Sequence, residues 1–311
     1  MNAISLTKNK NSAPRWPEIN FPEMQDTIET LHQWIQIVGK IRLRTMPWQN
    51  HSWHCTLYIT STGFSTHGIP YRGLVFQIDF DFKQHKIFMH CSDTDVAEMD
   101  LRPMTVAQFY HELFDKLRSI GIDVEIHPSP NEVDPAIPFA DNTVNKSYDP
   151  EASSSIWQAM LRANGVFHKF RSEFIGKASP VHLFWGAFDL AVTRFSGNAA
   201  PLHPGGVPNM SLEVMQEAYS QEVSSAGFWL GSKAFPIPVF YAYAYPAAPE
   251  FGAQKVLPKE AFYDAQMGEY FLKYEDVRKA ENPGQTLHDF LQTTYEAVAN
   301  TAKWNRKKIE K

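Results

Sequence analysis

Hydrophobic side chains in the first part of the chain recur first at helical spacing and then at strand spacing. Residues 26–43 carry apolar side chains three or four positions apart, which predicts a helix that ends near Gly39 or Arg44. Short alternating segments follow and predict strands. Pro103 then opens a second helix, which ends at Gly121. The apolar positions of the first helix are Leu31, Trp34, Ile35, Val38 and Ile41, and the strands lie at residues 51–60, 74–82, 86–91 and 96–101.

The second part of the chain shows the same order of elements. A helix over residues 156–177 is followed by strands at 181–193, 239–245 and 269–274, and Pro283 introduces a last helix. Strands joined by short loops pair antiparallel. The pattern therefore predicts an α+β fold, internally duplicated, with two helix–antiparallel-sheet–helix halves related by a pseudo-twofold axis. The closest matches are Gly39 and Lys40 with Gly176 and Lys177, and Ile78, Phe80 and Phe82 with Tyr241, Tyr243 and Tyr245.

The chain divides at a stretch rich in Pro and Asp that has little periodicity. We expect a disordered tail at residues 1–14, a first repeat at 15–126, a linker at 127–150 and a second repeat at 151–311. The second repeat is the longer one, and its extra residues are expected in an inserted loop at 196–235.

Composition and charge narrow the function. With a formal net charge of −5, the chain has no excess of Lys and Arg to neutralise the phosphates of a nucleic acid, so nucleic acid is not an expected partner. The longest apolar stretch, residues 181–192, contains Asp189 and is too short for a bilayer, so no membrane contact is expected. Two cysteines, Cys55 and Cys91, suit free thiols in the cytoplasm. Cofactor and oligomeric state stay open.

Several long motifs resemble a known family. They are WPEI, QIVGKIRL, NHSWH, IDFDF, PFADNTVNKSYDPEA, GKASPVHLFWGAFDLAVTRFSG and YSQEVSSAGFWLG, and they extend from Trp16 to about Trp304. The chain is similar to an uncharacterised bacterial family of proteins of this length, known as a domain of unknown function. The resemblance implies no activity, substrate, cofactor or catalytic residue.

The densest polar cluster is NHSWH, residues 50–54. If this segment is a strand, His51 and Trp53 share one face and His54 lies on the other. The two histidines then cannot both reach one metal ion, so the segment is a weak candidate for a metal site. A metal-dependent enzyme that uses His51, His54, His182 and Glu222 is nevertheless one hypothesis for the function.

The apolar segment 181–194 contains the polar residues that draw most attention. Read as one strand, it places His182 and Arg194 on one face, and Trp185 with Asp189 on the other. A strand that is apolar on both faces is buried on both, so Asp189 is expected in or beside the core. Its carboxylate is then either paired with Arg194, Lys40 or Lys177, or it serves catalysis or ligand orientation.

A segment at residues 219–231 is interpreted as a loop that covers a pocket. It brings Tyr219 and Glu222 toward His182 and Arg194, and these groups could supply a general acid and base. No nucleophile elbow, phosphate loop, dinucleotide fingerprint or zinc-protease helix is present in the sequence.

Lys40 and Lys177 each follow a glycine at an expected helix end, where a cation complements the helix dipole. A paired placement about the pseudo-twofold axis would also let the two ammonium groups hold an anionic ligand.

The function that the sequence favours is small-molecule binding between the two halves, with or without catalysis. The candidate catalytic residues are His182, Arg194, Glu222 and Asp189. The candidate ligand-binding residues are His51, Trp53, His54, Trp185, Tyr219, Trp229, Lys40 and Lys177. This hypothesis predicts that His182→Ala and Arg194→Ala leave the melting temperature nearly unchanged and abolish binding. The alternative is a non-catalytic scaffold or interaction protein, in which His182, Asp189 and Arg194 are buried and satisfy one another.

Overall fold

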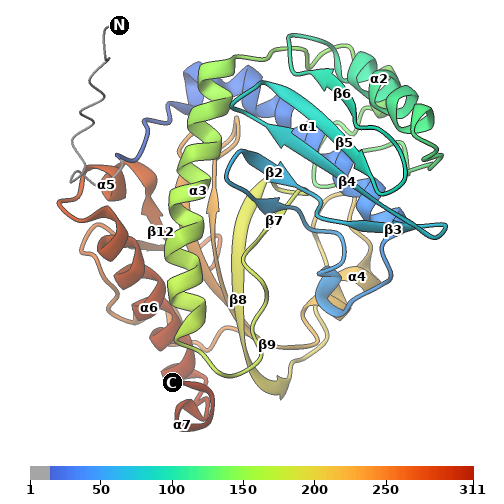
Figure 1. The fold of residues 1–311 in the computed structure, drawn as a ribbon. Helices are drawn as coiled ribbons and strands as arrows, with labels where there is room; N and C mark the ends of the chain where they lie inside the picture. Colours follow the sequence, from blue (N-terminus) through green and yellow to red (C-terminus); the bar gives the residue numbers. More distant parts are fainter. Residues whose placement is uncertain (1–14) are drawn as a thin grey trace, which may run out of the picture.

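Two antiparallel sheets, each set along the chain between two long helices, make up residues 15–311 in a computed structural model (Figure 1). The fold is therefore α+β, as predicted. The tail predicted at residues 1–14 lies outside the described residues. None of the helices within residues 15–311 combines the length and the apolar character that crossing a bilayer requires.

The first half contains a six-stranded sheet whose strands follow one another as an antiparallel meander. The order is β1-β2-β4-β5-β6, and the short β3 pairs with the beginning of β4. Pro22 lies in the first turn of helix α1, and a capping box at Thr105 starts α2. The elements are α1 (Phe21–Thr45), η1 (Asn50–Ser52), β1 (Tyr58–Ile59), β2 (Gly63–Ser65), β3 (Ile69–Tyr71), β4 (Leu74–Asp81), β5 (Lys86–Cys91), β6 (Ala97–Asp100) and α2 (Val106–Ser119).

The second half contains another six-stranded antiparallel sheet, in the order β7-β8-β9-β10-β12-β11. The expected linker, residues 127–150, contains only the short turn η2 (Phe139–Asp141) before α3 begins at Pro150. The remaining elements are α3 (Pro150–Ser172), β7 (His182–Phe184), β8 (Asp189–Ala199), α4 (Leu212–Ala218), β9 (Gln221–Trp229), β10 (Val239–Tyr245), η3 (Phe251–Ala253), β11 (Phe262–Asp264), β12 (Glu269–Lys273), α5 (Tyr274–Lys279), α6 (Pro283–Thr301) and α7 (Arg306–Ile309).

Among residues 15–311, one isolated antiparallel bridge, between Leu57 and Leu183, joins the two sheets. The Leu57 amide donates to the Leu183 carbonyl at 2.9 Å, and the Leu183 amide donates back at 2.8 Å. Buried side chains from both halves form one continuous hydrophobic core. The halves are therefore joined by backbone pairing as well as by packing.

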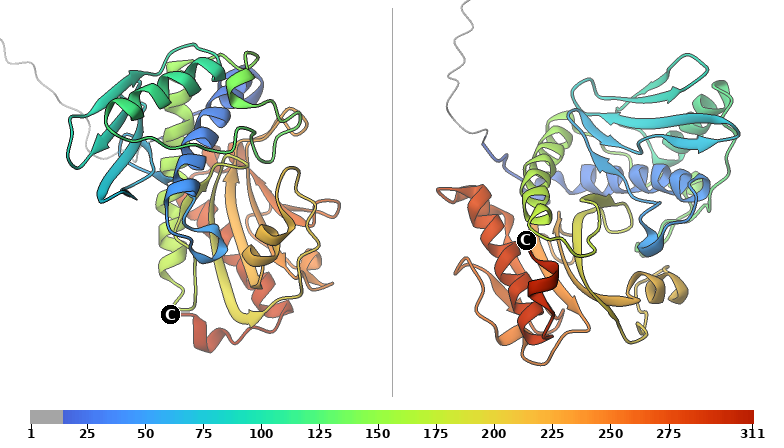
Figure 2. Two further views of the ribbon diagram at one scale, coloured as in Figure 1. Left: turned by 90° about the vertical axis from the view of Figure 1, so that its right-hand side faces the viewer. Right: turned by 60° about the horizontal axis from the view of Figure 1, so that its bottom comes forward.

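Helix α1 lies between the first sheet and the loops of the second half (Figure 2). Its five apolar positions predicted from spacing are all fully buried. Polar residues on its other side, including Gln36 and Lys40, are buried too. Helix α1 is therefore covered on both sides. Its polar face contacts the turn of the second sheet and the linker, at the place where the two halves meet.

The segment 181–193 is not one strand but a hairpin. Strands β7 and β8 pair antiparallel with His182 opposite Ala191 and Phe184 opposite Asp189. Directly paired residues share a face, so His182 and Asp189 lie on the same face of the sheet and Arg194 lies on the opposite one. The sequence-based assignment of faces was wrong because residues 185–188 reverse the chain, with Phe188 in the left-handed region at φ 57°.

Three further expectations are corrected. The segment expected as an inserted loop at 196–235 contains the central strand β9, which pairs with both β8 and β10. The NHSWH segment is a 3-10 turn, with His51 and Ser52 both at φ 57°, so strand alternation does not apply to it. Helix α1 continues to Thr45, so Lys40 lies inside the helix, whereas Lys177 follows the end of α3.

The residue matches between β4 and β10 also fail. Strand β4 is third along its sheet and β10 is fourth along the other. Ile78 and Phe80 are fully buried in the core, whereas Tyr241 and Tyr243 are half-buried, and it is Phe240 between them that enters the core. The matched positions therefore differ in strand and in environment.

Candidate functional site

The turn between β7 and β8 packs on α1 through the indole ring of Trp185. Trp185 donates from Nε1 to the Cys55 carbonyl at 2.7 Å, and its ring lies against Gly39. A Cβ at Gly39 would lie 2.1 Å from the Trp185 Cδ1 atom. His32, two helical turns before Gly39 on α1, is hydrogen-bonded through Nε2 to the Gly186 carbonyl at 2.7 Å. The glycine of the QIVGK motif is thus needed so that the turn can approach the helix.

Residue Asn131 of the linker is held on the same helix. Its amide donates to Gln36 Oε1 at 2.8 Å, Gln36 Nε2 donates back to the Asn131 carbonyl at 2.8 Å, and Lys40 donates to the Asn131 side chain. This places the next residue, Glu132, against the β7–β8 turn, where a Cβ at Gly186 would lie 1.9 Å from Glu132 Oε1. The linker therefore contributes a carboxyl group to the seam between the halves.

Asp189 begins β8 directly after the turn and is only 7% exposed. Its carboxyl accepts a hydrogen bond from the Tyr241 hydroxyl. Burial raises the Asp189 pKa to about 6, although the hydrogen bond from Tyr241 opposes that change. The predicted burial of Asp189 is confirmed. Its predicted cationic partner is wrong, because Asp189 forms no salt bridge with any cation among residues 15–311.

Two half-buried glutamates act together with Asp189, and we call Asp189, Glu132 and Glu269 the carboxyl centre. Burial, with a smaller contribution from the Asp189 charge, raises the pKa values of Glu132 and Glu269 to about 7. Neither glutamate carboxyl forms a salt bridge or hydrogen bond with the residues that the structure describes. The centre is therefore an acidic cluster without a protein cation.

Tyrosines surround this centre. Tyr219 and Tyr243 share a hydrogen bond between their hydroxyls at 2.7 Å, and the rings of Tyr241 and Tyr243 stack at 6.1 Å. Burial, with smaller contributions from the charges of all three carboxyls of the centre, raises the Tyr219 pKa to about 12. These three tyrosines are half-buried, so their rings are partly open to solvent. The result is a set of acidic groups with aromatic faces beside them.

The spacing of the acidic groups limits what they can bind. Within residues 15–311, no three His, Cys, Asp or Glu side chains lie close enough together to hold a metal ion. The predicted metal-site residues His51, His54, His182 and Glu222 accordingly do not gather. Carboxyl groups that are too far apart for a metal can still surround a larger organic cation, which aromatic faces also attract.

The predicted acid and base residues are separated. His182 is fully buried, neither ring nitrogen has a partner in the described chain, and burial lowers its pKa to about 3. Arg194 is on the opposite face of the sheet, with its guanidinium 3.4 Å from the Phe170 ring centre. Glu222 accepts from Asn198 at 3.1 Å. His182, Asp189 and Arg194 are all buried but do not satisfy one another, so the condition expected for a pure scaffold is not met.

Other predicted ligand-binding residues form a second cluster around Phe195, farther along β8. His51 donates from Nδ1 to the Ala218 carbonyl at 2.9 Å, and its Nε2 accepts from Lys177 at 2.5 Å. Lys177 also lies 5.8 Å from the Trp53 ring centre. Burial lowers the pKa of His51, and the nearby Lys177 charge lowers it further. His54 is bonded to Gln49, and Trp229 stacks on Phe235.

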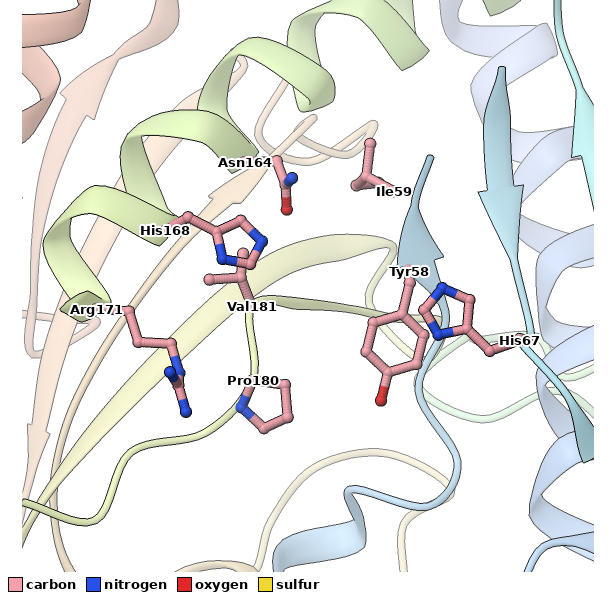
Figure 3. Close-up of a pocket in the computed structure, with 8 residues that line it drawn as sticks. All are labelled: Tyr58, Ile59, His67, Asn164, His168, Arg171, Pro180 and Val181. Atoms are coloured by element: carbon pink, nitrogen blue, oxygen red, sulfur yellow. The ribbon is translucent and has the colours of Figure 1, made fainter. Parts of the chain in front are cut away.

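Three features went unnoticed in the sequence. Glu132 and Glu269 come from the linker and from β12, and neither lies in a recognisable motif. The third feature is a cleft of about 340 Å³ between α3 and β1 (Figure 3). Its α3 residues Asn164, His168 and Arg171 follow one another at intervals of four and three positions, a polar stripe that the sequence does display.

The fold and this seam define an α+β protein of two joined antiparallel sheets with an unpaired carboxyl centre. The chain belongs to the Family of unknown function (DUF5996), which matches residues 16–311. The resemblance inferred from the motifs is thereby confirmed over nearly the whole chain. No curated protein and no solved structure matches the chain.

Proposed function

We propose that the protein binds a small organic cation, such as an amine, at the carboxyl centre. The observation that carries this proposal is that Asp189 is buried and Glu132 and Glu269 are half-buried while no cation among residues 15–311 pairs with them, and burial raises the pKa values of all three. A bound cation would offset the free-energy cost of burying these charges and would reduce their mutual repulsion.

The surroundings favour an organic cation over a metal ion or an anion. The carboxyls do not form a metal-binding group, and the half-buried rings of Tyr219, Tyr241 and Tyr243 offer negative faces to an ammonium. Lys40, one of the candidates for an internal counter-charge, donates to Asn131 instead. Because Asn131 is held on α1 of the first half and Asp189 lies in the second sheet, the ligand would lie between the two halves, as the sequence-based hypothesis expected.

Calorimetric titration with putrescine tests the proposal, and 1,4-butanediol serves as an uncharged ligand of similar length. We expect saturable putrescine binding that strengthens between pH 6 and pH 8, since the carboxyls lose their protons in this range. Glu269→Gln should weaken the affinity about tenfold by removing one charge. Glu222→Gln, which changes a glutamate bonded to Asn198 outside the centre, should leave it unchanged.

Two results would overturn the proposal. One is an equal heat signal for putrescine and butanediol, which would mean that charge is not recognised. The other is an equal loss of affinity in Glu269→Gln and Glu222→Gln, which would indicate attraction by the overall negative charge of the protein.

We also infer that the two halves arose by duplication. In support, both sheets lie between two long helices along the chain, and each contains a meander of five strands: β1-β2-β4-β5-β6 and β7-β8-β9-β10-β12. The first strands of the two meanders, β1 and β7, lie side by side next to the Leu57–Leu183 bridge, which suits a pseudo-twofold axis there.

For the cellular location we propose the cytoplasm. Cys55 and Cys91 are both unpaired, and Cys55 is buried with its thiol pKa raised by that burial to about 12. Unpaired thiols are typical of reducing compartments.

A further inference from the structure

The cleft between α3 and β1 is lined by basic and polar groups. Figure 3 shows Asn164, His168 and Arg171 of α3 facing Tyr58 and His67 of the first half across the opening. None of the residues that line the cleft carries a carboxyl group. The cavity has a volume of about 340 Å³ and contains three basic side chains and no acidic one. Its charge therefore differs in sign from that of the whole chain, which is −5.

Two of the three basic groups, Arg171 and His67, are held in place by the fold. Arg171 donates from Nε to the Ser179 carbonyl at 2.5 Å, and its two terminal nitrogens have no hydrogen bond or ion pair with the described residues. The His67 ring stacks on Tyr58 at 4.3 Å with an interplanar angle of 3°. A guanidinium fixed through Nε presents its remaining donors in a plane, which is the geometry that oxyanions accept.

A buried arginine stands behind these groups. The guanidinium of Arg42 lies 5.5 Å from the Tyr58 ring centre and donates to the Thr66 carbonyl. Arg42 is only 5% exposed and forms no salt bridge within residues 15–311. Its positive charge is therefore uncompensated beside the cleft.

The electrostatic state of the histidines agrees with this arrangement. Burial lowers the pKa values of His67 and His168, and the charges of Arg42 and Arg171, respectively, lower them further. Asp79 is the carboxylate that acts on His67 in the opposite direction. It accepts from Gln77 at 2.7 Å, lies 3.5 Å from His90 and is not among the residues that line the cleft.

We propose that this cleft is a binding site for a small oxyanion, either a phosphoryl group or a carboxylate group of a small molecule. The anion would lie between Arg171 and His168 on one side and His67 on the other, with the Asn164 amide as a further donor. An oxyanion there would accept from the unpartnered guanidinium nitrogens and would favour the protonated histidines. This site is separate from the carboxyl centre and does not depend on the function proposed there.

The test is a calorimetric titration at constant ionic strength with sulfate, which represents a phosphoryl group at every pH used, and with acetate, which represents a carboxylate. We expect saturable binding of one of the two anions that strengthens from pH 8 to pH 6, since His67 and His168 must gain protons. Arg171→Gln and His168→Ala should each weaken the affinity about tenfold. Lys169→Gln removes a positive charge from the same turn of α3 outside the cleft and should change the affinity less than twofold.

The histidine ring signals in NMR spectra provide a direct second readout. The pKa values of His67 and His168 should rise when the anion is present. Because His168 is exposed, His168→Ala retains the fold even if Arg171→Gln proves unstable. Absence of saturable binding of both anions would overturn the proposal, and so would an equal effect of Lys169→Gln and His168→Ala.

Discussion

Tyr241 donates its hydroxyl hydrogen bond to Asp189 from two strands away, across Gly227. Strands β10, β9 and β8 are neighbours, and Tyr241 on β10 is paired with Gly227 on β9. A Cβ at position 227 would lie 2.3 Å from the Tyr241 ring, so only glycine lets the phenol cross the strand. The geometry of the carboxyl centre therefore depends on a residue that carries no functional group.

The carboxyl centre predicts an unusual pH dependence of stability. The pKa of Asp189 rises from its ordinary value of 3.8 to about 6 in the folded protein, so the folded state binds protons more tightly than the unfolded chain does. The stabilisation from this group is complete below about pH 4 and is lost as the pH rises through 6. Because Asp189→Asn cannot lose a proton, the melting temperature of this variant should increase relative to that of the wild type as the pH rises from 4 to 7.

A surface carboxylate provides the control for this measurement. Asp115→Asn changes a residue whose side chain is 72% exposed on α2, and its melting temperature should stay parallel to that of the wild type over the same range. Thermal melts at several pH values decide the matter. If the melting temperature of Asp189→Asn runs parallel to the wild type as well, Asp189 is ionised with an ordinary pKa, and the carboxyl centre loses its main argument.

The contact between Gly39 and Trp185 predicts opposite effects of the same substitution at two helical glycines. Gly39→Ala places a methyl group on the Trp185 indole and should destabilise the protein by about 1–3 kcal/mol. Gly165→Ala in α3 meets nothing within 4 Å and should stabilise it by about 0.5–1 kcal/mol, since alanine is the better helix former. Urea unfolding measures both values. A gain of stability in Gly39→Ala would show that Trp185 does not rest on α1.

The sequence predicted α1 and the burial of Asp189 because both depend on local apolar pattern. It failed at the turn of residues 185–188, where Trp185 and Phe188 are as apolar as the strands around them. Those two side chains are buried by packing outside the strand ladder, so hydrophobicity alone does not separate strand from turn. The length of the segment, 13 residues against the usual five or six for a strand, is the signal that would have revealed a hairpin.

The composition of the carboxyl centre could not be predicted in the same way. Glu132, Asp189 and Glu269 come from the linker and from two strands of one sheet, and only the tertiary fold brings their charges together. The spacing of these three residues in the sequence therefore does not predict that their carboxyl groups lie near one another. The histidine and arginine of α3 that line the cleft, in contrast, do lie on one helix face, and a search for polar stripes on predicted helices would have found them.

Arg194 was a candidate catalytic residue, and its surroundings predict a structural role instead. It is 1% exposed, its guanidinium lies 3.4 Å from the Phe170 ring centre and 4.4 Å from that of Tyr295, and it donates to the Phe170 carbonyl. Burial lowers its pKa to about 10, so the group remains charged at neutral pH. The side chain therefore fixes β8 to helices α3 and α6 through aromatic faces and a carbonyl.

Arg194→Ala should accordingly lower the free energy of unfolding by about 3 kcal/mol, because it leaves a cavity among aromatic rings and removes a cation–π contact. Arg118→Ala, which removes an exposed arginine of α2, should change it by less than about 0.5 kcal/mol. At a temperature where Arg194→Ala is still folded, its putrescine affinity should equal that of the wild type, since Arg194 lies on the opposite face of the sheet from Asp189. An Arg194→Ala protein that melts like the wild type but no longer binds putrescine would instead restore Arg194 to the ligand site.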